Sequence, residues 1–342
     1  MLRITGYSDK YAAFPEEKVK FYINSEKSEN YDVQIVRLIH GDTNPEGPGY
    51  KEEEIGASCN GNYEGRNQKI HGGSYIVIPQ DNRFNTESFT LQAYVFPTTP
   101  DKGRQGLLTK WNENNNSGYG VFIDDNACLS VMIGDGDGQV FNLSSEKKLM
   151  RKVWYLVAAS YNSETGKVTL YQEPCVTPTN GGLGMSLLHP AEETTALVEG
   201  TNNVKPGIND APFLMAASTV KERSGRSISG GHYKEAINPV ELPEHSFVYN
   251  GKIDRPRLSN KALTKAEIES LASSYTACSS DLRAKVVGAW DFHANITKNI
   301  ASTFIVDVSP SHLNGFIINL PCRGMTGYNW TADDIVYHHK PE

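Results

Sequence analysis

Residues 88–96, Ser-Phe-Thr-Leu-Gln-Ala-Tyr-Val-Phe, carry the pattern that decides the fold. Apolar side chains occupy every second position of this stretch, at Phe89, Leu91, Ala93 and Val95. Polar side chains, Thr90 and Gln92, lie between them. Because successive side chains of a strand point to opposite faces, this alternation predicts a β-strand with one face in an apolar core.

Similar stretches continue after this strand, separated by turns rich in Gly, Asn and Asp. They lie at residues 106–111, 118–123, 129–133, 153–161 and 167–171, and a shorter one precedes it at 74–78. Many short strands at a spacing of about ten residues are typical of a β-sandwich or barrel. The centre of the chain is therefore predicted to be all-β.

The first seventy-one residues are predicted to form a separate, small β module. Residues 31–39 carry apolar side chains at both parities, with Val36 and Leu38 on one face and Val33 and Ile35 on the other. A strand that is apolar on both faces is usually covered on both sides. The Gly- and Pro-rich residues 41–49 then predict an exposed loop. Because two or three strands are marginal by themselves, the module is expected to pack on something else.

Beyond the central strands, residues 172–245 are rich in Gly, Pro, Thr and Asn, with one expected strand at 211–216. Long loops of this kind often cover a neighbouring surface. A helix is predicted to begin at the capping box Thr264–Glu267, with Leu263 and Ile268 placed for a hydrophobic staple. Further strands are expected at 285–292 and 315–320.

Composition excludes some classes of function. The chain has 342 residues and a net charge of -7, which argues against a nucleic-acid-binding surface. No run approaches about twenty apolar residues, so no membrane span is predicted. The first residues lack the apolar stretch of a signal peptide, and the five scattered cysteines form no Cys-x-x-Cys pair. We therefore expect free thiols, no zinc site and a cytoplasmic location.

Two groups of residues could hold a metal ion. Asp135 and Asp137 could offer carboxylates to Ca²⁺, but Gly-Asp-Gly-Asp-Gly at 134–138 is also a good hairpin turn, and we favour the turn. His338 and His339, with Asp333 and Asp334, could form a cluster near the end of the chain. Neighbouring residues of a strand point to opposite faces, so a surface or linker is the preferred interpretation.

Catalytic motifs are missing from the sequence. No Gly-x-Ser-x-Gly elbow occurs, and Cys59 and Cys322 are expected to be buried, small apolar side chains. A glycosidase would need two carboxylates on one strand face. No Glu-x-Asp-x-x-Glu strand is present, and the acidic run Glu52, Glu53 and Glu54 is interpreted as a solvated loop. No catalytic, cofactor-binding or metal-binding residue is therefore assigned.

Sugar binding remains open, because Trp111, Tyr119 and Trp154 could stack on a ligand. Aromatic side chains at strand positions more often belong to the core.

The strand at 89–97, the segments 106–111 and 154–168, and Gly251-Lys252-Ile253-Asp254 before the helix resemble the laminin-G/concanavalin-like fold in their order. The resemblance implies an all-β, concanavalin/laminin-G-like jelly-roll sandwich over residues 72–277. A small Ig-like β module at 1–71 would precede it, and an extended segment at 278–342 would follow it.

Other stretches resemble the N-terminal region of the large subunit of N,N-dimethylformamidase. They are residues 4–8, 36–42, 254–258, 289–292 and 319–330. In that family this region precedes an amidohydrolase domain, whose mononuclear iron is held by two Tyr and one Glu. None of those ligands has a matching position in this chain. The resemblance therefore implies that iron belongs to the catalytic domain, towards which residues 278–342 would lead.

The first hypothesis is therefore a non-catalytic N-terminal half of a dimethylformamidase-like large subunit, acting on linear amides as a whole. It would serve domain packing and subunit assembly. Its partners by resemblance are the catalytic domain of the same subunit, further copies in a homo-oligomer and a small helical subunit. A freestanding lectin-like carbohydrate-binding module is the alternative, and a self-sufficient hydrolase is a third hypothesis for which the sequence offers no site.

Overall fold

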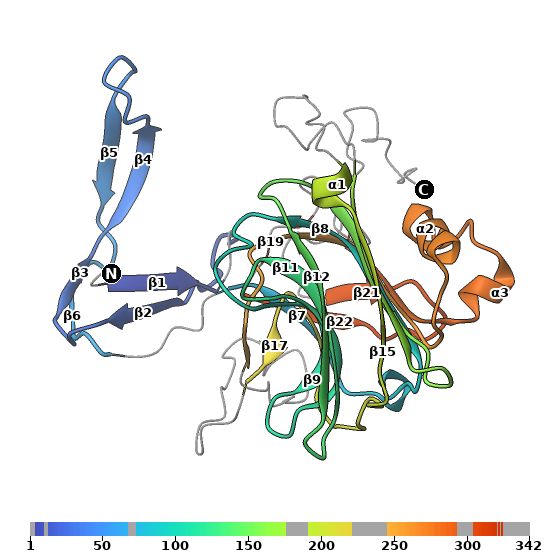
Figure 1. The fold of residues 1–342 in the computed structure, drawn as a ribbon. Coiled ribbons are helices and arrows are strands. Elements are labelled where there is room, and N and C mark those ends of the chain that lie inside the picture. Colours follow the sequence, from blue (N-terminus) through green and yellow to red (C-terminus); the bar gives the residue numbers. More distant parts are fainter. Residues whose placement is uncertain are drawn as a thin grey trace. The chain divides into compact units, whose positions relative to one another are not determined.

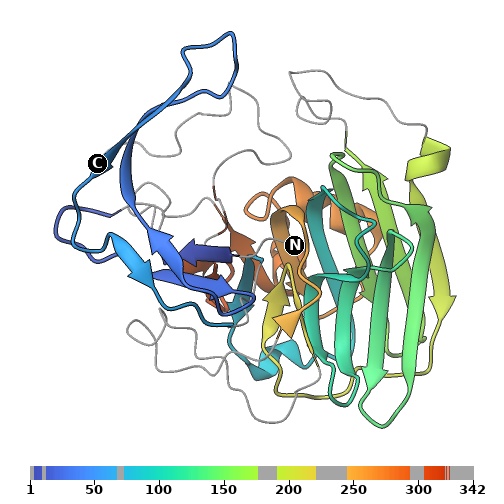
Figure 2. The same ribbon diagram turned by 90° about the vertical axis from the view of Figure 1, so that its left-hand side faces the viewer.

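The computed structural model describes residues 4–9, 13–67, 73–175, 191–220, 245–292, 304–319, 321 and 323. The chain divides into two compact units, Met1–Gly72 and Gly73–Glu342. The second unit is all-β, as predicted, and its strands form one long antiparallel sheet that curls into two facing layers (Figures 1 and 2). β12, the first strand in the order of this sheet, contacts β15, the last.

Each strand of the curled sheet pairs with the strands that flank it in the sheet order. One part of the order is β12 (Val140–Lys148), β11 (Cys128–Asp135), β10 (Ser117–Ile123), β9 (Gln105–Asn112), β16 (Phe213–Met215), β7 (Tyr75–Ile78), β22 (Gly315–Ile318) and β21 (Phe304–Asp307). The order continues through β20 (Val286–Asp291), β19 (Gly251–Ser259), β8 (Phe89–Pro97), β13 (Tyr155–Tyr161), β14 (Lys167–Pro174) and β15 (Ala196–Thr201).

The remaining elements of the second unit are short. β17 (Ser218–Thr219) pairs with β18 (His245–Ser246). The helices are a 3₁₀ turn, η1 (Asn82–Phe84), followed by α1 (Ala191–Thr194), α2 (Lys265–Ser273) and α3 (Ser280–Arg283). Among the described residues, no helix is long and apolar enough to cross a membrane.

The core lies between the two layers of the sheet. The apolar side chains at alternate positions of β8 point into it. Phe89, Leu91, Ala93 and Val95 are all buried in this cluster, as predicted. The Phe89 ring stacks on Tyr119 of β10 with ring centroids 4.2 Å apart, so the two layers meet at this pair. Burial of aromatic rings supplies much of the apolar area that stabilises such a sandwich.

The opposite face of β8 is covered by α2 and the loop before it. The polar side chains of this face keep hydrogen-bond partners there: Gln92 Nε2 donates to the carbonyl of Ile268, and Thr90 Oγ1 donates to that of Lys261. α2 begins at the predicted capping box, in which Thr264 and Glu267 each accept from the other's main-chain N–H. A second apolar cluster, which includes Leu263 and Ile268, joins the helix to the sheet.

Three strands from the C-terminal part of the chain lie inside the sheet. β22 pairs with β7, and β21 joins β22 to β20. Ser74 Oγ donates to the carbonyl of Asn319, so residues 245 positions apart are neighbours. Residues 278–342, predicted to be an extended segment that leads towards a catalytic domain, thus contribute β20, β21 and β22 to the sheet.

The first unit is made of short β-ladders. Its described residues form three two-stranded ladders, β1 (Ile4–Ser8) with β2 (Phe21–Ser25), β3 (Tyr31–Val33) with β6 (Gly61–Tyr63), and β4 (Ile35–Gly41) with β5 (Tyr50–Ile55). The residues between β4 and β5 form the predicted exposed loop. None of the apolar side chains within described residues 4–67 is buried.

Candidate functional site

A groove of about 380 Å³ lies on the face of β13, β14 and β15 that α2 partly covers. Its floor is formed by the buried side chains of Tyr171, Leu263 and Ile268. The hydroxyl-bearing Ser160 and Thr169 are cross-strand partners beside this floor. The phenol oxygen of Tyr171 is buried and has no hydrogen-bond partner in the structure.

The charged groups of the groove are already engaged. Lys167 Nζ lies 2.8 Å from Glu199 Oε1, and Lys265 Nζ lies 5.1 Å from the centroid of the Tyr171 ring. Glycoside hydrolysis by the common mechanisms needs two carboxyl groups that flank the substrate. Glu199 is the one carboxylate among the described residues that line the groove, so these residues do not supply that pair.

A second constellation surrounds Arg257, a buried arginine of β19. Its Nη1 donates to the carbonyls of Pro256 and Trp290, both at 2.9 Å. The strand is irregular here, because its register against β8 shifts between Asp254 and Arg257, and Arg255 has a φ of 47°. The guanidinium is therefore held by main-chain oxygens at a β-bulge. A bulge changes the direction in which a side chain leaves the strand.

Burial and, to a smaller extent, the positive charge of Arg255 lower the pKa of Arg257 to about 10. The carboxylates of Asp254, Asp291 and Asp307 oppose this effect. Burial likewise lowers the pKa of Arg323, and Asp291 again opposes it. Asp291 attracts both arginines.

The convergence on Asp291 links three stretches that resemble the dimethylformamidase family. Residues 254–258 supply Arg257, residues 289–292 supply Asp291, and residues 319–330 supply Arg323. Arg323 Nη1 also donates to the carbonyl of Phe304 in β21. The hydrogen bonds of Arg257 to the carbonyl of Trp290 and of Arg323 to the carbonyl of Phe304 tie the segments that carry these arginines to β20 and β21. We interpret this cluster as structural.

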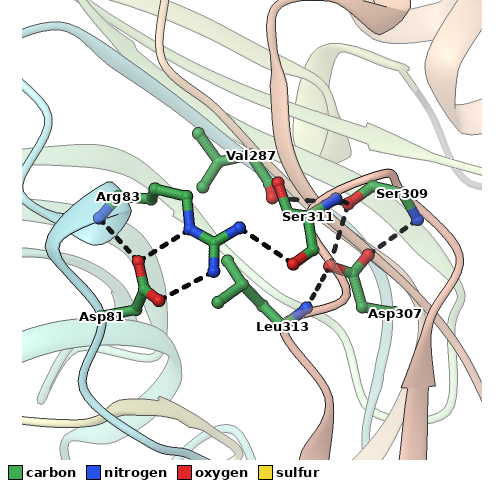
Figure 3. A network of polar contacts seen from close by, with 7 residues as sticks. All are labelled: Asp81, Arg83, Val287, Asp307, Ser309, Ser311 and Leu313. Carbon is green, nitrogen blue, oxygen red and sulfur yellow. Dashed lines mark hydrogen bonds and ion pairs between the residues drawn. The ribbon is translucent and has the colours of Figure 1, made fainter.

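Figure 3 shows how a neighbouring carboxylate, Asp307, organises the turn between β21 and β22. Its oxygens accept from the main-chain N–H groups of Ala289, Ser309 and Leu313 and from the Ser309 hydroxyl, at 2.8–2.9 Å. The same turn is held from the other side by Arg83, which donates to the carbonyl of Ser311.

The predicted calcium candidates form a hairpin turn. Asp135 Oδ1 accepts from the main-chain N–H groups of Asp137 and Gln139, at 2.8 and 3.0 Å. That carboxylate therefore stabilises the turn, which is the interpretation that the sequence favoured. Within the part of the chain that the structure describes, no group of three or more His, Cys, Asp and Glu side chains could hold a metal ion. Asp333, Asp334, His338 and His339 lie outside the described residues.

The three aromatic candidates for sugar stacking are interior residues. Trp111, Tyr119 and Trp154 are each at most 1% exposed. Trp111 Nε1 donates to Glu113, and the Tyr119 hydroxyl donates to the carbonyl of Phe84. No ring of this set is available to a ligand, so the core interpretation holds for all three.

Two expectations from the sequence were wrong in detail. Cys59 is exposed rather than buried, because none of the described apolar side chains of the first unit is buried around it. Glu52, Glu53 and Glu54 belong to β5, a paired strand, rather than to a loop, although they are exposed as predicted. The sequence expectation failed there because three consecutive charges are unfavourable in most strands. Cys322, the other cysteine expected to be buried, lies outside the described residues.

The class of the second unit follows from its sandwich and from a family comparison. The family model described as the concanavalin A-like lectin/glucanases superfamily matches residues 71–180. These residues include β7 to β14, the strands that form much of both layers. The unit is therefore a concanavalin A-like β-sandwich, as the resemblance implied.

Two curated relatives match the chain over its whole length. The chain is 32% identical to the N,N-dimethylformamidase beta subunit of Paracoccus aminophilus and 32% identical to that of Alcaligenes sp. The match covers 100% of this chain and 42% of each relative, so the chain spans less than half of their length. These two relatives confirm the predicted resemblance to N,N-dimethylformamidase.

Solved structures with a related sandwich are more distant. A proposed carbohydrate-binding protein from Bacteroides ovatus is 14% identical, with a TM-score of 0.43 over 80% of this chain and 68% of that protein. The CBM40 module of Ruminococcus gnavus IT-sialidase is also 14% identical, with a TM-score of 0.36 over 55% of this chain and 85% of the module.

Proposed function

We propose that this chain is the non-catalytic, N-terminal part of a dimethylformamidase-like large subunit, which it helps to pack and assemble. The observation that carries the proposal is the similarity to two N,N-dimethylformamidase beta subunits, which extends over the whole chain but over only 42% of each relative. Amide hydrolysis would then belong to the longer protein.

The described residues support a packing role rather than a chemical one. The groove beside α2 lacks an acid–base pair, and the charges around Arg257 hold strands of the sandwich. The first unit has no buried apolar side chain among its described residues, and such a unit needs another surface for stability. We therefore infer that another surface covers it.

Iron, in this proposal, is held by residues outside this chain. The longer subunit would supply the two Tyr and the Glu, a small helical subunit would join it, and copies of the pair would form the oligomer. The part played by this chain is to present surfaces to these partners. No step of the amide hydrolysis is assigned to its residues.

The test compares this 342-residue chain with the longest product of its gene. Iron content is measured by elemental analysis, and hydrolysis of N,N-dimethylformamide by the release of formate. We expect iron and hydrolysis in the longer protein and neither in the shorter chain. Hydrolysis or stoichiometric iron in the shorter chain would contradict the proposal, and so would a longer product that lacks both.

A further inference from the structure

The groove beside α2 has the size of a binding site for a small molecule. Its volume of about 380 Å³ lies within the range of about 300–1,000 Å³ that is typical of such sites. The residues that line it are described and belong to the second unit, so the lining does not depend on where the first unit lies. The chemistry of these residues indicates the class of ligand.

Three hydroxyl groups of the groove lack a hydrogen-bond partner. Ser160 of β13 and Thr169 of β14 are cross-strand partners, and Tyr171 follows Thr169 on the same face of β14. The phenol oxygen of Tyr171 is unpaired, and within the described part of the chain neither Ser160 nor Thr169 makes a side-chain hydrogen bond. Ser160 is only 6% exposed and Tyr171 only 3%, so bulk water has little access to either side chain. Because a hydroxyl group both donates and accepts, a ligand with hydroxyl groups of its own would complement this set.

Apolar side chains lie beside these hydroxyl groups. Leu197 of β15 is the cross-strand partner of Tyr171 and is 57% exposed. Leu263 and Ile268 line the groove where it meets α2. The ligand therefore needs an apolar surface next to its hydrogen-bonding groups. A sugar ring has this arrangement, because its C–H groups form an apolar face and its hydroxyl groups project from the edge.

The charges of the groove favour a neutral ligand. Lys167 Nζ is paired with Glu199 Oε1 at 2.8 Å. Lys265 Nζ lies 3.6 Å from Glu269 Oε1 and 3.7 Å from Glu173 Oε2. A charged ligand would have to compete with these pairs. A neutral hydroxyl group can instead accept from Lys167 and donate to Glu199 while the two stay together.

We propose that the groove beside α2 binds a neutral oligosaccharide, with room for about two pyranose rings. The lining follows β14 from Lys167 to Tyr171, which is about 13 Å at the rise of a strand and accommodates two linked rings. The C–H face of one ring contacts Leu197, and its hydroxyl groups bond with Thr169 and Glu199. Sugar binding of this kind goes beyond the proposed function and does not depend on it.

The first test measures the binding of maltose, cellobiose, lactose and xylobiose to the longest gene product by saturation-transfer NMR. We expect at least one of these neutral disaccharides to bind. Thr169→Val keeps the shape of the side chain but removes its hydroxyl, so it should weaken binding by about ten-fold or more, and Glu199→Gln should do the same. Thermal unfolding shows that each variant is folded.

Thr201→Val is the matched control for Thr169→Val. Thr201 is exposed and lies on the same face of β15 as Glu199, but outside the lining of the groove. Its replacement should leave binding unchanged. The proposal is overturned if none of the disaccharides binds, or if Thr169→Val binds them as tightly as the wild type and Thr201→Val do.

The second test examines the charge of the ligand and its fate. Digalacturonic acid has two sugar rings but carries carboxylates, so we expect it to bind more weakly than the best neutral disaccharide by about ten-fold or more. Equal or tighter binding would overturn the neutral class of ligand. Because Glu199 is the one carboxylate among the described lining residues, the bound disaccharide should stay intact. Chromatography that shows release of monosaccharides, abolished in Glu199→Gln, would contradict a binding-only site.

Discussion

The ammonium group of Lys110 lies 2.8 Å from both the main-chain and the side-chain oxygen of Asn209 in the interior of the sandwich. It also donates to Gln80 Oε1 and to the carbonyl of Ala211, and its side chain is completely buried. A buried charge is tolerated where several oxygens replace its water shell. Lys110 thus ties β9 to the segment that precedes β16.

Replacing Lys110 with Met should destabilise the protein by about 2–4 kcal/mol, because buried oxygens then lose their donor. Burial lowers the pKa of Lys110 to about 8, below the ordinary value of 10.5. The folded protein therefore releases this proton at a lower pH than the unfolded chain, and the wild type should gain stability relative to Lys110→Met between pH 8 and 10.5. Urea unfolding across this range measures the difference; a constant difference would contradict the assigned protonation.

Asp307→Ala should be among the most destabilising single changes in the second unit. Three main-chain N–H groups and the Ser309 hydroxyl lose their acceptor, so we expect a loss of about 3 kcal/mol or more. Asp137→Ala is the matched control, since this exposed aspartate sits in a turn and its carboxylate has no such role. Thermal unfolding of both variants tests the contrast, and equal losses would disprove the role of Asp307.

The ion pair of Asp81 and Arg83 should contribute a small, acid-sensitive part of the stability. Hydrogen bonds from Arg83 lower the pKa of Asp81 to about 2, from an ordinary value of 3.8. The contribution is therefore present above pH 3.8 and is lost as the pH falls towards 2. Because both side chains are partly exposed, we expect less than about 1 kcal/mol. Asp81→Asn should remove this pH dependence, and unfolding curves at about pH 2.5 and pH 6 would show whether it does.

Removal of the capping box should loosen α2 without unfolding the sandwich. Thr264→Ala leaves the N–H of Glu267 without its acceptor and should cost about 1 kcal/mol. The double variant Thr264→Ala/Glu267→Ala should cost less than the sum of the two single changes, because the two side chains act on each other. A double-mutant cycle by urea unfolding measures this coupling; strict additivity would contradict it.

The sequence predicted most of the strands because alternation is a local signal. β8, β11 and the capping box of α2 lie where their patterns placed them. The position of β22 between β7 and β21 could not be predicted in this way. Pairing between residues about 240 positions apart produces no pattern in the sequence of either strand. Topology of this kind depends on the whole set of strands.

The buried polar contacts could not be predicted from the sequence either. Lys110 and Arg257 look like ordinary surface residues of β-strands, and only the fold brings oxygens from distant segments to them. The groove beside α2 combines β13, β14, β15 and the start of the helix, so its hydroxyl groups carried no motif. The apolar pattern of β4 was visible from the start, and it predicted cover on both faces, but none of the described apolar side chains of the first unit is buried.

The place of β20, β21 and β22 in the middle of the sheet constrains how this protein is made. A ribosome synthesises β7 well before β20, β21 and β22, the strands that join β7 to β19, so the nascent chain carries an unpaired sheet edge at β7 until they follow. The sandwich can close only once residue 318 has left the exit tunnel. Biosynthesis of this unit is therefore governed by its last strands, and chaperones that mask open edges should matter most in that interval.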